Sequence, residues 1–310
     1  MGIDFGNALI QEGASLFAER LNRQPFSFRH DLARDSLFDD AGIVRLWHQA
    51  EARGGGHRPV VVAGRADGVE PVPLAATGPG SLIGRGRTMR IAYLQDHDAG
   101  CADLLRRIVA EADALAGGSL AGEIGFPSLT LLVSAPGALT NFHMDHQSNL
   151  LFQLRGRKLV SLFDAADREV LEEAAIERYY NGTVFAARYR ESFQRKAAAY
   201  VLMPGDGLHN PPLGPHWVRN GEEVSVSLSV NFSLRHTEAR ARVYQVNGLL
   251  RRLGLAPTPP GRLALTDRLK QAPFRLLSRQ RPQSVAELVR SGPAGWLAPL
   301  RALRGRRSGS

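Results

Sequence analysis

A stretch of 24 residues, TNFHMDHQSNLLFQLRGRKLVSLF (140–163), constrains this chain more than any other part of it. It places His143 two positions before Asp145, in a segment whose flanks alternate between apolar and polar residues as a β-strand does. Because side chains at positions i and i+2 of a strand point to the same face, the imidazole and the carboxylate would project side by side. We interpret the pair as two ligands of a metal site.

A third ligand is offered by the segment NPPLGPHWVRNGEEVSVSLSVNF (210–232), in which His216 comes shortly before the alternating run 224–230. Two histidines and one carboxylate are the ligand set of non-haem Fe(II) oxygenases. Taken singly, Asp145 could cap a turn and either histidine could be an ordinary core or surface residue. The combination of the three on two strand-like segments favours the metal site.

Lys158 is a further candidate. Its offset of fifteen residues from His143 would put it on the opposite face of one continuous strand, but 155–157 (Arg-Gly-Arg) predicts a turn. Lys158 would then begin the returning strand and could face the same interior. A buried cation needs an anionic partner, and the distal carboxylate of 2-oxoglutarate is one candidate. An ordinary lysine in a turn is the alternative.

The hydrophobic pattern predicts short strands joined by tight turns, which is typical of an antiparallel barrel or jelly roll. Strands are expected at 59–63, 88–95, 129–134 and 199–203, and helices at 5–21, 40–52, 102–115, 168–180, 238–253 and 263–279, the last interrupted at Pro273. We therefore expect a mainly β fold with flanking helices. Its parts would be an N-terminal mixed segment (1–87), a catalytic core (88–234) and a basic helical extension (235–310) that ends in a frayed tail (301–310).

The positive net charge of +9 belongs to the C-terminal quarter of the chain. From Arg235 onward there are 16 Lys/Arg and 3 Asp/Glu, whereas the residues before it hold 23 and 27. The overall charge is therefore no argument for nucleic-acid binding by the core, and no DNA- or RNA-binding motif is recognised. The single cysteine, Cys101, excludes an intramolecular disulfide framework and fits a reducing compartment. With no signal peptide and no long apolar run, we expect a cytoplasmic protein without a membrane span.

The motifs of this chain resemble those of the JmjC/cupin-like 2-oxoglutarate oxygenases, particularly the asparaginyl hydroxylase that acts on hypoxia-inducible factor. The resemblance covers roughly 93–232, with an uncertain alignment between 163 and 199. The matching elements are His143-Met144-Asp145, Asn149, the Gln153 to Lys158 segment (QLRGRK), Pro204-Gly205-Asp206, Pro211-Pro212, His216 and Val230-Asn231-Phe232. One departure is that Gly214-Pro215 directly precede His216, where family members often carry two aromatic residues.

This resemblance implies a double-stranded β-helix core that binds Fe(II) through His143, Asp145 and His216. It also implies that Lys158 and Thr140, completed by Tyr93, hold the distal carboxylate of the cosubstrate 2-oxoglutarate. The family pattern further brings Asn149 and Asn231 near the metal-bound end of 2-oxoglutarate.

Three functions are compatible with these features. The first is hydroxylation of a peptide or protein side chain with O2 and 2-oxoglutarate, which the resemblance favours. The second is hydroxylation of a small metabolite or natural product on the same scaffold, and the third is a non-catalytic cupin-like binding or regulatory protein. Leu249, Leu250 and Leu253 give one C-terminal helix an apolar stripe. Since C-terminal helices dimerise in the asparaginyl hydroxylase, we expect a homodimer in which this extension serves assembly and not the catalytic site.

Overall fold

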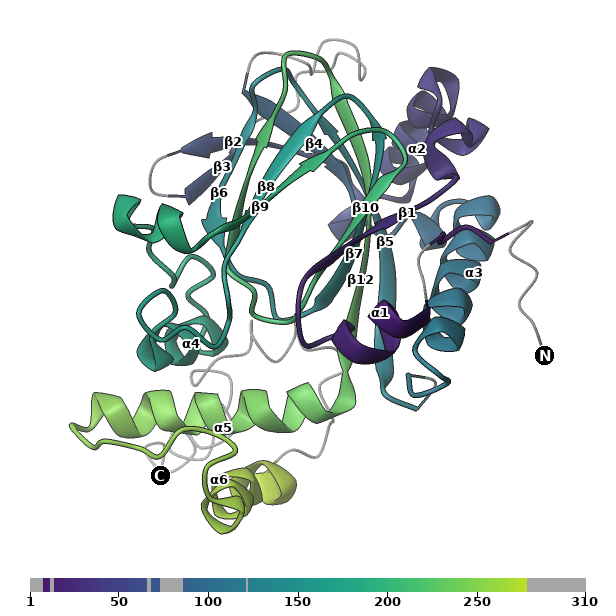
Figure 1. Ribbon diagram of the computed structural model, residues 1–310. Coiled ribbons are helices and arrows are strands. Elements are labelled where there is room, and N and C mark those ends of the chain that lie inside the picture. Colours follow the sequence, from purple (N-terminus) through teal and green to yellow (C-terminus); the bar gives the residue numbers. More distant parts are fainter. Residues whose placement is uncertain (1–7, 12–13, 66–67, 73–85, 121, 278–310) are drawn as a thin grey trace, which may run out of the picture.

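Two antiparallel sheets that face each other form the centre of the molecule (Figure 1). The computed structural model describes residues 8–11, 14–65, 68–72, 86–120 and 122–277. The tail expected at 301–310 and residues 5–7 of the first expected helix lie outside these residues. Residues 8–11 are not helical, so the helix expected at 5–21 is confirmed only for Ala14–Arg20. Every pair of neighbouring strands in the two sheets is antiparallel, which agrees with the jelly-roll core expected from the sequence.

Eight of the described strands form the larger sheet. They are β1 (Phe26–Arg29), β2 (Val60–Arg65), β3 (Gly68–Val72), β4 (Arg87–Ile91), β5 (Ile124–Ser134), β7 (Ser148–Arg155), β10 (Asp206–Asn210) and β12 (Ser225–Leu234). Their order across the sheet is β1-β10-β7-β12-β5-β4-β2-β3. The smaller sheet consists of β6 (Leu139–His143), β8 (Lys158–Leu162), β9 (Ala198–Leu202) and β11 (His216–Asn220), in the order β6-β11-β8-β9.

The two faces of the larger sheet differ in polarity because side chains alternate along each strand. On β12, Val226, Leu228, Val230 and Phe232 are fully buried in the main hydrophobic core, which also contains helix residues. The alternate residues are small and polar, and two of them, Ser229 and Asn231, line the space between the sheets. The space between the sheets is therefore polar where β12 borders it, which suits a binding site better than a packed core.

Helices α1 (Ala14–Arg20), α2 (Asp40–Arg53) and α3 (Ala99–Leu115) cover the outer face of the larger sheet (Figure 1). The helix α2 lies where the sequence predicts it, and Asp39 caps it by accepting a hydrogen bond from the Gly42 amide at 2.7 Å. Asp98 caps α3 in the same way through the Cys101 amide. Cys101 itself is a free, buried thiol.

A tight turn joins β7 in the larger sheet to β8 in the smaller sheet, at the Arg-Gly-Arg sequence that predicts it. Gly156 has a positive φ of 70°, and a Cβ at this position would lie 2.6 Å from the Val224 carbonyl oxygen. Only glycine fits there without a shift of the backbone. Lys158 is consequently the first residue of the returning strand β8.

A second hydrophobic core lies below the smaller sheet, where α4 (Glu173–Tyr180) meets the long helix α5 (Arg235–Arg252) (Figure 1). The expectation that the C-terminal extension serves assembly alone is wrong for the first half of α5, which packs within its own chain. Ala241, Val243 and Tyr244 are almost completely buried within this chain, and Ala241 and Tyr244 belong to the core that includes α4.

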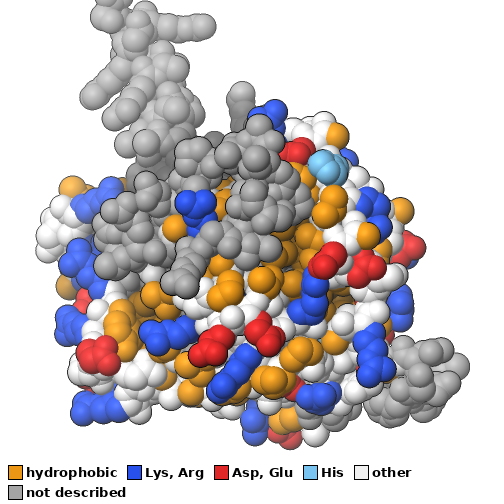
Figure 2. All heavy atoms as spheres, turned by 90° about the horizontal axis from the view of Figure 1, so that it is seen from above, with side chains coloured by type: hydrophobic (Ala, Val, Ile, Leu, Met, Phe, Trp, Pro, Cys, Tyr) orange, Lys and Arg blue, Asp and Glu red, His pale blue; other side chains and the backbone are white. Residues whose placement is uncertain are grey.

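Leu253, Leu255, Leu265 and Leu269 are exposed in the single chain, the last two on helix α6 (Ala264–Leu277). Seen from the end of the molecule opposite to α5, the described surface carries interspersed acidic, basic and hydrophobic side chains (Figure 2). This agrees with the near balance of charges before Arg235. No helix in the described part of the chain is long and apolar enough to cross a membrane.

Candidate metal centre

Two histidines from neighbouring strands meet at one end of the smaller sheet. His143 is the last residue of β6 and His216 the first of β11, and the antiparallel register places them directly opposite each other. Their ring centroids are 4.1 Å apart. Asp145 lies just beyond the end of β6, so the expectation that both residues of the pair lie on a strand is wrong for Asp145. Oδ2 of its carboxylate nevertheless lies 3.6 Å from Nε2 of His143.

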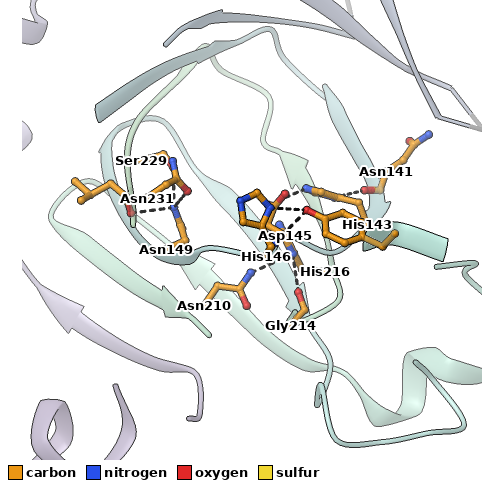
Figure 3. Close-up of polar contacts among 12 residues, drawn as sticks. Asn141, His143, Asp145, His146, Asn149, Asn210, Gly214, His216, Ser229 and Asn231 are labelled. Atoms are coloured by element: carbon orange, nitrogen blue, oxygen red, sulfur yellow. Dashed lines mark hydrogen bonds and ion pairs between the residues drawn. The ribbon is translucent and has the colours of Figure 1, made fainter. Parts of the chain in front are cut away.

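The possible ligand atoms of His143, Asp145 and His216 all lie within 4.8 Å of one another, close enough to hold one metal ion. Nδ1 of His143 lies 2.7 Å from the carbonyl oxygen of Asn141, and Nδ1 of His216 lies 3.0 Å from that of Gly214 (Figure 3). An Nδ1–H that donates to a carbonyl leaves Nε2 unprotonated and free to bind a metal. In both cases the carbonyl belongs to the residue two positions earlier, so local backbone geometry fixes the tautomer.

The protonation of the three side chains fits a cation site. Burial and, to a smaller extent, the neighbouring His143 lower the pKa of His216 to about 4. Burial acts in the same direction on His143, but the Asp145 carboxylate outweighs it and raises the pKa of that imidazole. Burial by itself raises the pKa of Asp145, and the two histidines hold it well below its usual range. The carboxylate is thus ionised at neutral pH and supplies the negative charge that a divalent ion requires.

Lys158 lies inside the molecule, between the two sheets. On β8, Leu162 lies opposite His216, and Lys158 lies four positions before Leu162. At the rise of a strand, the backbone of Lys158 is therefore about 13 Å from the metal-binding end of the sheet. Its side chain is buried, and the amine donates a hydrogen bond of 2.6 Å to the Ser227 hydroxyl on the opposite sheet. Lys158 forms no ion pair with any described residue, and burial lowers its pKa to about 7. A cation in this position is suited to an anionic ligand.

A cavity of about 350 Å³ connects the histidines with Lys158. Thr140 lines it from β6, and Asn149 and Asn231 line it from the larger sheet. The two asparagines are direct register partners, and the Asn149 amide donates to Oδ1 of Asn231 at 2.9 Å and to the Ser229 hydroxyl at 2.7 Å (Figure 3). These amides give the wall between the two ends of the cavity fixed donors and acceptors.

The structure does not bring Tyr93 to this cavity. Strand β4 ends at Ile91, and Tyr93 has a left-handed backbone (φ 59°) before a short 3-10 helix, Leu94–Asp96. Its ring is partly exposed and contacts His57, with the centroids 5.6 Å apart. Thr88 and Arg90 of β4 line the cavity, but the strand ends two residues before Tyr93, and the left-handed residue starts a helix there.

Several residues in the region of the site were not assigned a role from the sequence. Arg90 lines the cavity from β4, and it makes no hydrogen bond or ion pair with the described residues. The Asn210 amide lies 3.1 Å from Nδ1 of His216. Tyr179, on α4, contacts His146, the residue after Asp145. His209 is completely buried and is held by the Asn149 carbonyl and the Asn22 amide, which makes it a structural residue.

The sheets and the cluster of donors between them define a cupin-like domain. Residues 90–238 match the model of the cupin-like domain family. The match covers the part of the chain whose motifs predicted a cupin-like core. No curated protein sequence matches this chain significantly.

Solved structures of Escherichia coli YcfD have a similar fold. One of them is 16% identical, with a TM-score of 0.53, and the similarity covers 88% of this chain and 69% of that one. Another, of the ribosomal oxygenase YcfD with cobalt and succinic acid, is 15% identical with a TM-score of 0.49 and the same coverage. A third, with cobalt and 2-oxoglutarate, is 17% identical with a TM-score of 0.46 and covers 87% and 68%. At these identities the likeness concerns the fold.

Proposed function

We propose that this protein is an Fe(II)- and 2-oxoglutarate-dependent hydroxylase that acts on a peptide or protein side chain. The observation that carries this proposal is one cavity with two kinds of group in it. Three metal-binding donors lie at one end, and the buried amine of Lys158 projects into the same space from β8. A ligand with a metal-binding end and a distal carboxylate matches both.

The donor set fits Fe(II). With Nδ1 at a backbone carbonyl, His143 and His216 each direct Nε2 to the metal, and Asp145 offers an ionised oxygen. Two histidines and one carboxylate would form the facial arrangement that leaves open positions on the metal. When bound, the metal and 2-oxoglutarate supply the oxidising chemistry with O2, and the products are succinate, CO2 and a hydroxylated substrate. The protein's own groups orient these components and limit the access of water.

Lys158 and Thr140 would bind the distal carboxylate of 2-oxoglutarate. The amine already has a hydrogen-bond partner in Ser227, whose hydroxyl donates to Gln153 at 2.6 Å, so its direction is fixed before the ligand arrives. Binding of the carboxylate would offset the cost of keeping this cation in the interior. Asn149 and Asn231 would hydrogen-bond to the part of the cosubstrate nearer the metal.

The size of the cavity favours a substrate that enters only in part. A volume of about 350 Å³ is at the lower end of the range for small-molecule sites, and 2-oxoglutarate would occupy a share of it. A single side chain of a peptide can reach the remaining space while its backbone stays outside. Hydroxylation of a small metabolite is the second candidate. The guanidinium of Arg90 on the cavity wall pairs with none of the described residues and would suit a metabolite with an acidic group.

An anaerobic titration with Fe(II) and 2-oxoglutarate, followed by assay of succinate after addition of O2, tests this proposal. The substrate panel should contain peptides, ribosomal proteins and small acidic metabolites. Ribosomal proteins belong in it because YcfD, which shares the fold, is a ribosomal oxygenase. We expect substrate-stimulated succinate formation and a mass increase of one oxygen atom in a peptide or protein. Stimulation by metabolites alone would favour the second candidate, and metal binding without any succinate would favour a non-catalytic binding protein.

A further inference from the structure

The segment that carries two of the three donors alternates between two environments. His143 and Asp145 face the cavity, whereas Phe142 and Met144 are buried in the second hydrophobic core. That core also contains Ile176, Tyr179 and Tyr180 of α4, and Ala241 and Tyr244 of α5. Because protein cores are closely packed, a shift of α4 or α5 would move the backbone that sets the positions of the two donors.

The loop with Asp145 has a direct connection to α4. Since Asp145 lies beyond the end of β6, the strand ladder does not hold it. The buried hydroxyl of Tyr179 accepts a hydrogen bond from the His146 amide at 3.2 Å and lies 2.8 Å from Nδ1 of the same residue. One hydroxyl therefore binds both the backbone and the side chain of the residue that follows the carboxylate donor.

Helix α5 in turn holds α4. The rings of Tyr180 and Tyr244 stack with centroids 5.7 Å apart, and the Gln245 side chain donates to the Tyr180 carbonyl at 3.0 Å. Arg251, near the end of α5, binds both carboxylate oxygens of Glu177 at 2.6 and 3.0 Å. Glu177 is 2% exposed, so this bidentate ion pair fixes α4 and α5 relative to each other.

We propose that Tyr179 is a positioning residue for the metal centre, and that α5 up to Arg251 acts on the centre by holding α4. The basic C-terminal segment would then support the metal site and not serve assembly alone. This inference rests on the metal centre proposed above. It concerns how firmly the donors are held and makes no assumption about the substrate.

The first test compares Tyr179→Phe with Tyr180→Phe. Both replacements remove one hydroxyl from neighbouring buried tyrosines, but the Tyr180 hydroxyl makes no hydrogen bond with the described residues. Binding of Co(II) would be followed by its absorption bands under anaerobic conditions. We expect Tyr179→Phe to weaken Co(II) binding about 10- to 100-fold and to alter the bands, because outer partners of metal ligands commonly have such effects. Tyr180→Phe should match the wild type.

The second test compares Arg251→Ala with Arg252→Ala. Arg252 is exposed on the adjacent position of α5, whereas Arg251 pairs with the buried Glu177. We expect Arg251→Ala to weaken Co(II) binding at least about 10-fold and Arg252→Ala to leave it unchanged. Near-ultraviolet circular dichroism would verify that the variants are folded.

The possible outcomes separate this inference from the proposed function. If the wild-type protein does not bind Co(II), the metal centre itself is wrong. If it binds Co(II) but Tyr179→Phe binds equally well with unchanged bands, the positioning role of Tyr179 is wrong. Equal affinities of folded Arg251→Ala and Arg252→Ala would overturn the role of α5.

Discussion

Replacing Lys158 by methionine removes a buried positive charge at nearly constant volume. If the amine binds the distal carboxylate of 2-oxoglutarate, its loss leaves that carboxylate without a partner in a buried site. Breaking a buried ion pair costs about 3–5 kcal/mol, which corresponds to a loss of roughly 100- to 5,000-fold in affinity. The metal-binding donors lie about 13 Å away along the strands, so metal affinity should change little.

The same substitution should stabilise the protein in the absence of 2-oxoglutarate. Burial lowers the pKa of Lys158 from 10.5 to about 7. The folded state therefore binds fewer protons than the unfolded state between these two values, and the cost to stability is complete below about pH 7 and disappears above pH 10.5. This shift corresponds to about 4–5 kcal/mol below pH 7, of which Lys158→Met would recover the greater part.

Isothermal titration calorimetry with 2-oxoglutarate, on protein loaded anaerobically with a divalent metal, measures the first effect, and thermal unfolding of the metal-free protein measures the second. Lys196→Ala is a suitable control, since this lysine pairs with Asp167 and Glu169 away from the cavity. An unchanged 2-oxoglutarate affinity in Lys158→Met would refute the role of Lys158. A lower thermal stability of that variant would contradict the argument from burial.

Three further predictions follow from the structure. The 2-oxoglutarate dissociation constant should rise about fivefold from pH 7 to pH 8, because ligand binding favours protonated Lys158 and its pKa in the free protein is about 7; calorimetry at both pH values would detect this, and a flat profile would count against it. Metal affinity should fall as the pH drops below neutrality, because the pKa of His143 is raised and protons then compete with the metal for this imidazole; a Co(II) titration at pH 5.5 and 7.5 checks it, and equal affinities would exclude His143 as a ligand. Light scattering should show a homodimer, and Leu265→Asp should weaken it, since this leucine is 70% exposed in the single chain; a monomeric wild-type protein would end the dimer prediction.

The sequence predicted those parts of the site that depend on local pattern. Because a turn precedes Lys158, the alternation of side chains begins anew with the strand that Lys158 starts. In the structure the lysine is indeed buried at the start of β8. The two capped helices α2 and α3 also followed from local signals, because Asp39 and Asp98 bind amides within their own segments.

What the sequence could not predict depends on contacts between distant segments. Tyr93 matched a family position in a short motif, but the strand ends before it and its ring contacts His57. Asp145 reaches His143 from a loop and not from a strand, a geometry that spacing alone does not distinguish. The link from Arg251 through Glu177 to the metal loop joins residues 74 positions apart, and no pattern in either segment indicates it.

The central claim is that His143, Asp145 and His216 bind one divalent metal ion. The most direct measurement is an anaerobic Co(II) titration of the wild-type protein and of His143→Ala, Asp145→Ala and His216→Ala, monitored by absorption. The account predicts one Co(II) per chain in the wild type and a severe loss of binding in each of the three variants, with the fold retained. Unaltered stoichiometric binding in any one of these variants would contradict it.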